Sequence, residues 1–97
     1  MDTFYVLLKQ FIISSRELLS VEDIKEVEHY FNHSEYEMAL EGLLIELTKL
    51  GKYPREFNFS EWRELGEHYQ LDKETVFDEF IWIKFLKWGN NHTSQNI

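Results

Sequence analysis

The chain of 97 residues is the size of one domain and has no room for a second. Its hydrophobic content of 43% and aromatic content of 16% argue against disorder, and the lack of cysteine excludes disulfide bonds and thiolate metal sites. A formal net charge of −8 disfavours binding to nucleic acid or to an anionic membrane surface and favours a basic partner.

The hydrophobic periodicity predicts about five helices, and the first two have clear boundaries. The first is expected from about Asp2 to Ser15, where apolar residues recur at helical spacing. The second is expected to begin after Ser20, whose hydroxyl suits an N-cap, and to run to about Asn32.

The third predicted helix follows closely. Ser34 with Glu37 three residues later matches a capping box, and Gly51 directly after Leu50 is a typical stop signal. Residues 52–59 contain the single proline and form the one extended loop that the sequence predicts.

Two further helices complete the predicted set. Ser60 is expected to cap a short fourth helix that ends at about Tyr69. Asp72 is expected to cap a fifth helix that ends near Trp88, just before a glycine. This last helix is apolar nearly all round, with Trp82 on a different face from its main stripe, so it is expected to be central or to self-associate.

The expected fold is therefore an all-α single compact bundle of about five helices, because no alternation of period two indicates a strand. Residues 1–89 are expected to form the domain, and residues 90–97 a flexible polar tail. No apolar stretch reaches the ~20 residues that a membrane span needs, and the N-terminus lacks the charge pattern of a signal peptide. The absence of cysteine fits a reducing compartment, so we expect a cytoplasmic protein.

The charge imbalance lies in one third of the chain. Between Glu17 and Glu46 there are nine acids and one base, Lys25, whereas the rest of the chain is balanced. A segment with this charge attracts a basic partner and accelerates encounter with it. It is the first place to look for a binding surface.

The acids of this segment fall on the helix faces opposite or beside the predicted core stripes. Glu22 and Glu26 are like charges four residues apart, which is unfavourable in a helix, and Tyr30 is of a type enriched at binding hot spots. The competing interpretation is a solvated face. The predicted partner-binding residues are Glu22, Asp23, Glu26, Tyr30, Glu37 and Glu41.

Three other residues of the third helix have two interpretations. Met38 and Ile45 lie opposite its core stripe, where they would contact either a partner or another helix. Gly42 costs roughly 1 kcal/mol in a helix interior relative to alanine, and close approach of another helix is its plainest explanation.

We expect no enzymatic activity, no metal and no cofactor. His29 and His33 have the spacing of helical metal ligands, but no HExxH motif or specific third ligand accompanies them. The sequence contains no glycine-rich phosphate loop and no nucleophile motif.

From Ile24 to Phe85 the chain resembles a known family. The resembling elements are His29-Tyr30, His33-Ser34-Glu35-Tyr36, Ala39-Leu40-Glu41, Glu61-Trp62, Leu65-Gly66-Glu67 and Tyr69-Gln70-Leu71-Asp72. Their pattern is similar to that of the MafI-type immunity proteins of bacterial polymorphic toxin systems, relatives of the immunity proteins of contact-dependent inhibition. The resemblance implies a small, acidic, helical protein that neutralises a co-encoded toxin, often a nuclease of the EndoU type.

These observations predict an immunity protein that binds and blocks the basic C-terminal domain of one toxin through its acidic helical face. We expect no direct nucleic acid binding and no membrane binding. The alternative is a small helical adaptor or a homodimeric structural protein joined through the fifth helix, with no toxin partner.

Overall fold

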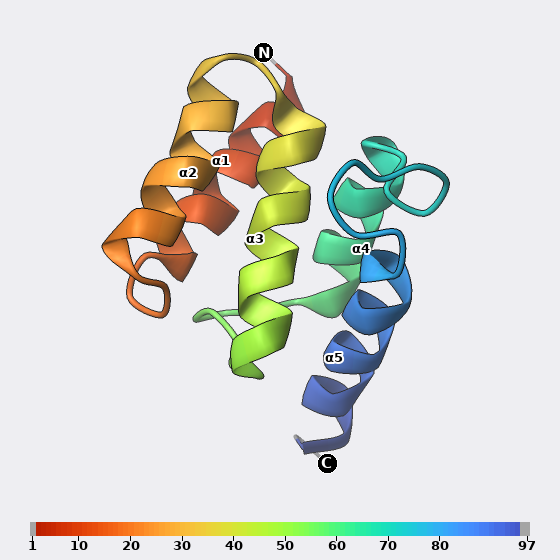
Figure 1. Cartoon of the computed structure of the whole chain (residues 1–97). Helices are drawn as coiled ribbons and strands as arrows, with labels where there is room; N and C mark the ends of the chain where they lie inside the picture. The colour runs from red at the N-terminus through yellow and green to blue at the C-terminus, as the bar shows by residue number, and fades with distance from the viewer. Residues whose placement is uncertain (1, 96–97) are drawn as a thin grey trace.

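The computed structural model describes residues 2–95, and the side chains of residues 2–92. Figure 1 shows five helices joined by short turns and by two longer loops. They are α1 (Thr3–Ser15), α2 (Val21–Asn32), α3 (Tyr36–Leu50), α4 (Phe59–His68) and α5 (Ile81–Gln95). No strand occurs in residues 2–95, so the predicted all-α bundle of five helices is confirmed.

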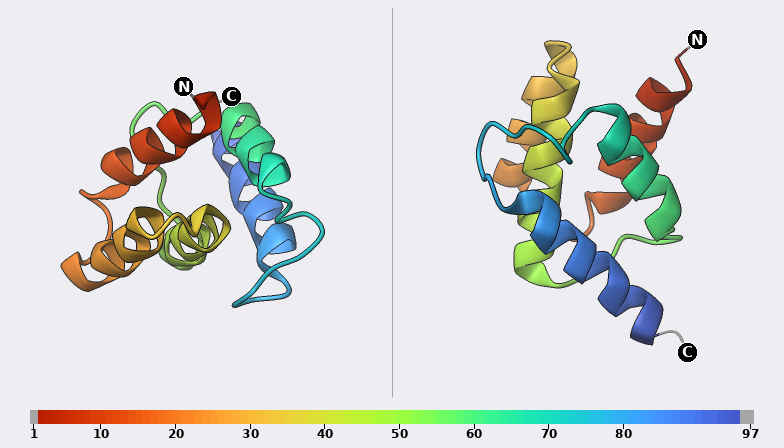
Figure 2. Two further views of the ribbon diagram at one scale, coloured as in Figure 1. Left: turned by 90° about the horizontal axis from the view of Figure 1, so that it is seen from above. Right: turned by 90° about the vertical axis from the view of Figure 1, so that its right-hand side faces the viewer.

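The helices lie along three sides of a common core. In the left view of Figure 2, α1 forms one side, the α2–α3 hairpin the second, and α4 with α5 the third. Helix α3 is central, since it contacts α1, α2 and α5. One long face of the α2–α3 hairpin is left open to solvent beside the segment that precedes α5 (Figure 1).

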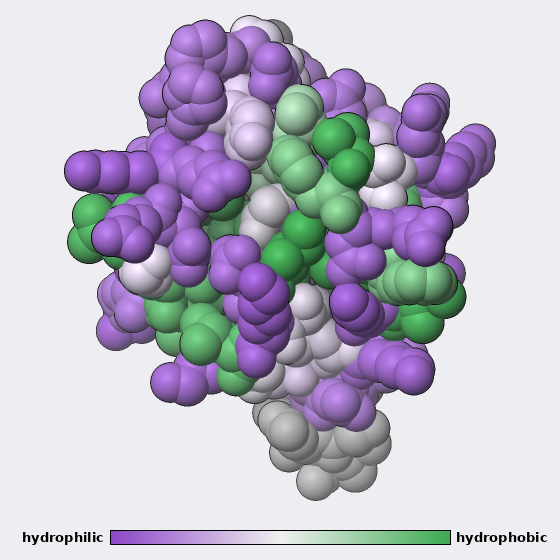
Figure 3. All heavy atoms as spheres, in the orientation of Figure 1, coloured by the Kyte–Doolittle hydropathy of each residue, from purple (hydrophilic) through white to green (hydrophobic). Residues whose placement is uncertain are grey.

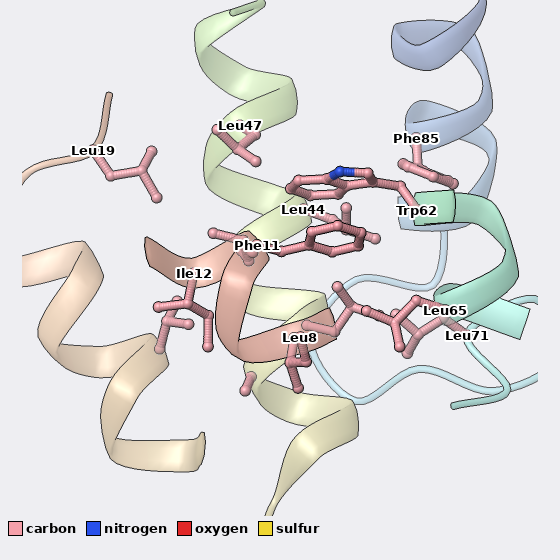
Figure 4. Close-up of a cluster of buried hydrophobic side chains, with 14 of the residues drawn as sticks. Leu8, Phe11, Ile12, Leu19, Leu44, Leu47, Trp62, Leu65, Leu71 and Phe85 are labelled. Atoms are coloured by element: carbon pink, nitrogen blue, oxygen red, sulfur yellow. The ribbon is translucent and has the colours of Figure 1, made fainter. Parts of the chain in front are cut away.

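Aromatic stacking between α1 and α4 fixes the centre of the core. The rings of Phe11 and Trp62 stack with centroids 4.1 Å apart and an interplanar angle of 10°. Figure 4 shows this pair with Leu8, Leu44 and Phe85 gathered around it. These three side chains are at most 1% exposed, and each buried side chain of this kind contributes roughly 1.5–3 kcal/mol.

Three of the predicted helix boundaries are confirmed by their caps. The Asp2 carboxylate accepts a hydrogen bond from the Phe4 N–H at 3.0 Å, which opens α1. The Ser20 hydroxyl accepts from the Asp23 N–H at 3.1 Å, which opens α2. Gly51 ends α3 with a φ of 66°, a left-handed conformation that glycine adopts without strain.

The predicted caps of α3 and α4 are wrong. Ser34 does not form a capping box, because its φ of 61° places it in the turn that ends α2. Helix α3 instead begins at Tyr36, without a side-chain cap. The cap of α4 is Asn58, whose side chain accepts from the Glu61 N–H, and Ser60 lies inside the first turn.

The predicted start and end of the fifth helix are both wrong. Residues 72–80 are not helical, because the backbone N–H groups of residues 76–78 donate to Glu41 and not to carbonyls one turn earlier. The helix also continues through Gly89 to Gln95. Gly89 is not a stop signal but a packing position, because a β-carbon there would overlap the Phe59 ring. Residues 90–95 of the expected tail are therefore helical, and residues 96–97 lie outside the described part.

Candidate partner-binding groove

A groove of about 200 Å³ runs along the open face of the α2–α3 hairpin. Its acids are Asp23 and Glu26 on α2 and Glu46 on α3. The other lining residues are Val27, Tyr30, Gly42, Ile45 and Phe77. The groove thus brings together three of the six predicted binding residues, namely Asp23, Glu26 and Tyr30.

The hydropathy of this face matches the lining of the groove. Figure 3 shows hydrophobic side chains gathered along the middle of the face, over α3 and the segment before α5, between hydrophilic side chains on either side. A partner that covers this face would therefore meet an apolar strip with charged margins.

Two of the three groove acids lack an ion-pair partner among the described side chains. Neither Asp23 nor Glu26 forms an ion pair among the described side chains. Glu28, on the same helix, is paired with Arg16 at 2.8 Å, and Glu46 has Lys49 only at 3.7 Å. Two of the three unpaired acids of α2 thus line the groove.

An aromatic pair forms one wall of the groove. The ring centroids of Tyr30 and Phe77 are 5.6 Å apart with an angle of 43° between the ring planes. Phe77 is 45% exposed, and it comes from the loop before α5. A planar cationic group of a partner can stack on such rings while its charge faces the carboxylates.

Gly42 keeps the groove open. A β-carbon at this position would meet only Val27 Cγ2, at 3.6 Å, which is ordinary van der Waals contact. Close helix approach, the explanation expected from the sequence, is therefore wrong. What the glycine provides is the absence of a side chain between the two helices where the groove lies.

Glu41 is not a surface residue, contrary to its predicted place on the binding face. Its side chain is fully buried, and both carboxylate oxygens accept backbone hydrogen bonds from the loop before α5. Oε1 accepts from Val76 N–H at 2.7 Å, and Oε2 accepts from the N–H groups of Phe77 and Asp78 at 2.8 Å each. Glu41 cannot touch a partner, but it holds Phe77 at the groove.

The two remaining predicted residues lie outside the groove. Glu22 is exposed in the first turn of α2. Glu37 lines a separate hollow of about 390 Å³, which it shares with Met38, His68 and Tyr69 among others. The six predicted residues therefore do not form one surface.

Two of the groove residues that sequence reasoning did not assign to the binding surface are Glu46 and Phe77. Glu46 could have been predicted from the sequence, because it belongs to the acidic segment and follows Gly42 by four residues, one helical turn. Phe77 could not have been predicted, because the hydrophobic pattern placed it in the core stripe of a helix, whereas residues 72–80 are not helical. The hydrogen bond from the Phe77 N–H to Glu41 holds this residue in the loop, where its side chain is exposed.

A larger hollow of about 500 Å³ lies between α3 and α5, and its lining is mainly basic, unlike the acidic lining of the groove. Its lining includes Lys49, Lys84 and Lys87. Two of these lysines are paired, Lys49 with Glu46 and Lys84 with Asp78. This hollow does not fit a basic partner, so the smaller groove is the better candidate despite its size.

Besides Tyr53, whose pKa is raised by burial, two titratable groups near these hollows have shifted pKa values. The hydrogen bonds from Lys84 and from the Phe80 N–H lower the pKa of Asp78, which lies in the loop that Glu41 holds. Burial raises the pKa of Tyr69 to about 12, and its hydroxyl has no hydrogen-bond partner among the described residues. Asp78 is thus kept charged and Tyr69 neutral.

The histidine pair His29 and His33 lines none of the three hollows described above. The rings of His29 and His33 have centroids 4.3 Å apart, and a ring nitrogen of His33 lies 2.7 Å from the carbonyl oxygen of His29. Within the described residues, no three side chains of the metal-binding types are grouped so as to hold an ion.

Comparisons with known proteins identify no relative. No protein-family model matches the chain, and no curated protein or solved structure is significantly similar to it. None of the helices formed by residues 2–95 has the length and apolar character needed to cross a membrane.

Proposed function

We propose that this protein is an immunity protein that binds and neutralises the toxin encoded beside it, a basic nuclease, through the α2–α3 groove. One observation carries the proposal: the unpaired carboxylates of Asp23 and Glu26 line a groove whose wall is an exposed aromatic ring, Phe77. The resemblance of residues 24–85 to MafI-type immunity proteins supports the same function and favours an EndoU-type ribonuclease as the target.

Inhibition follows because the groove carboxylates compete with the substrate phosphates for the cationic side chains of the nuclease. A nuclease must present lysine and arginine side chains to the phosphates of its substrate. The carboxylates of the groove offer those cations an alternative anionic partner, and the aromatic pair formed by Tyr30 and Phe77 suits the flat face of an arginine. The inhibitor works by occupancy and not by catalysis, so one copy blocks one toxin.

Charge also sets the speed of inhibition. Steered association reaches about 10⁸–10⁹ M⁻¹s⁻¹ at low salt, against roughly 10⁵–10⁶ without steering. Fast capture protects a cell in which a few free toxin molecules are harmful. We place the protein in the cytoplasm, where such a nuclease meets its substrate.

A co-expression assay tests the proposal. Cells that produce the toxin encoded directly upstream should survive when they also produce the parent protein. Combined substitution Asp23→Asn and Glu26→Gln should reduce survival, whereas Glu28→Gln, which removes a charge already paired with Arg16, should not. Continued killing in the presence of abundant, folded parent protein would refute the function.

A further inference from the structure

Four large apolar side chains are exposed in residues 76–83, a segment that comprises the end of the loop before α5 and the first residues of that helix. It is named here the aromatic loop. Val76 is 63% exposed, Phe77 45%, Phe80 56% and Ile83 57%. Only three other large hydrophobic residues of the described chain are exposed to this degree, and they are scattered over α1, α2 and α3. The hydrophobic effect disfavours such a concentration unless something covers it.

The backbone of the aromatic loop is held by hydrogen bonds although four of its apolar side chains are exposed. The three hydrogen bonds to the buried Glu41 carboxylate hold residues 76–78. The next turn is held by Asp78, whose carboxylate accepts from the Phe80 N–H and from Lys84 Nζ, each at 2.8 Å. A loop that is ordered in advance loses little entropy when its side chains bind a partner.

The aromatic loop and the groove meet at Phe77. Phe77 belongs to both, because it lines the groove and contacts Tyr30. A partner that covers Phe77 therefore also faces the unpaired carboxylates of Asp23 and Glu26. A second copy of this chain would bring its own net charge of −8 to that contact, whereas a basic protein would be attracted.

We propose that the aromatic loop docks on an apolar patch beside the basic cleft of the toxin whose cations enter the groove, and that Glu41 is the residue that positions it. This inference rests on the proposed function and adds a second, apolar half to the interface. The acids would then set the rate of encounter, and the aromatic loop the lifetime of the complex.

The first experiment measures binding kinetics to the catalytically inactive C-terminal domain of the toxin encoded directly upstream. The double variant Phe80→Ser with Ile83→Ser should dissociate at least about tenfold faster than the parent, as expected for hot-spot residues. Its control is Ile13→Ser on α1, which removes a side chain of similar exposure (47%) outside the proposed binding surface. This variant should dissociate like the parent.

The second experiment separates positioning from folding. Glu41→Gln keeps the shape of the side chain but removes the charge that the three N–H groups face. The amide protons of residues 76–78 should exchange faster while α1–α4 keep their protection, and dissociation should accelerate. Combined with Phe80→Ser and Ile83→Ser, Glu41→Gln should add no further loss, because it acts through the same loop.

Each other outcome overturns the inference. If the parent binds the toxin and the Phe80/Ile83 double variant dissociates like Ile13→Ser, the aromatic loop is not part of the interface, although the proposed function stands. If the parent sediments as a dimer and the double variant as a monomer, a second copy covers the loop. If the parent does not bind the toxin domain at all, the proposed function fails and this inference fails with it.

Discussion

Gly66 on α4 lies directly under the indole ring of Trp82 on α5, and the ring occupies the place where a β-carbon of residue 66 would be. A glycine inside a helix is normally unfavourable by roughly 1 kcal/mol relative to alanine. Here the loss is offset by the close contact of two helices that would otherwise be held apart. The same arrangement recurs between Gly89 and Phe59, so α4 and α5 each receive an aromatic ring of the other.

We predict that Gly66→Ala destabilises the protein, by about 1–3 kcal/mol as for other overpacked sites. The added methyl group must displace the Trp82 ring, which also contacts Phe85 in the core. Thermal melts followed by circular dichroism measure the change. An unchanged melting temperature would show that the helices separate at little cost.

Gly42→Ala is predicted to have the opposite effect on stability. Its methyl group meets only Val27, at 3.6 Å, so the higher helix propensity of alanine should leave stability unchanged or raise it by up to about 1 kcal/mol. Toxin binding should nevertheless weaken, because the methyl group enters the groove. Melts and binding titrations on the same sample check both effects, and unimpaired binding would argue that the groove is not used.

The charge of the groove should act mainly on association. Asp23→Asn and Glu26→Gln should each lower the association rate with the toxin domain, and the loss should shrink as salt is raised. Glu28→Gln is the control, because Arg16 already pairs with that carboxylate. Equal effects of all three changes would mean that only net charge matters and not the position of the acids.

Alkaline pH should weaken the fold through Tyr69. Its pKa is raised to about 12 in the folded protein from an ordinary value of 10.0, with burial as the largest cause. The folded state therefore favours the neutral phenol, and this contribution to stability is full below pH 10 and is lost as the pH rises through 12.

Tyr69→Phe removes that group and provides the comparison. The variant should lose less stability than the parent between pH 10 and 12, as measured by denaturant unfolding at several pH values. At neutral pH it should be as stable as the parent, because the hydroxyl has no hydrogen-bond partner among the described residues. A variant that is clearly less stable at pH 7 would show that the hydroxyl contributes to the stability of the folded state.

Local signals predicted the fold well where they act within one helix. The Ser20 cap, the Gly51 stop and the apolar stripes of α1 to α3 depend on neighbours within a turn or two, and a sequence displays these directly. They also sufficed for Asp23, Glu26 and Tyr30, which share a face of α2 and line the groove.

Contacts between distant segments were not predictable from these signals. A buried glutamate that binds a loop 35 residues later in the chain looks, in sequence, like any acid on a helix flank. This caused a second error: the helix predicted to begin at Asp72 assigned Phe77 to the core, so the residue that forms one wall of the groove was not recognised. Similarly, Gly89 resembles a stop signal until the Phe59 ring opposite it is known.

The way in which Glu41 holds the loop has an evolutionary consequence. The carboxylate binds backbone N–H groups, which every residue except proline carries, so it imposes no requirement on the side chains at positions 76–78. Val76 and Phe77 can therefore mutate without loss of the anchor, and the loop can change its outer surface while its path is inherited. An inhibitor built in this way can follow a rapidly diversifying target by substitution at a few exposed positions, with the helical scaffold unchanged.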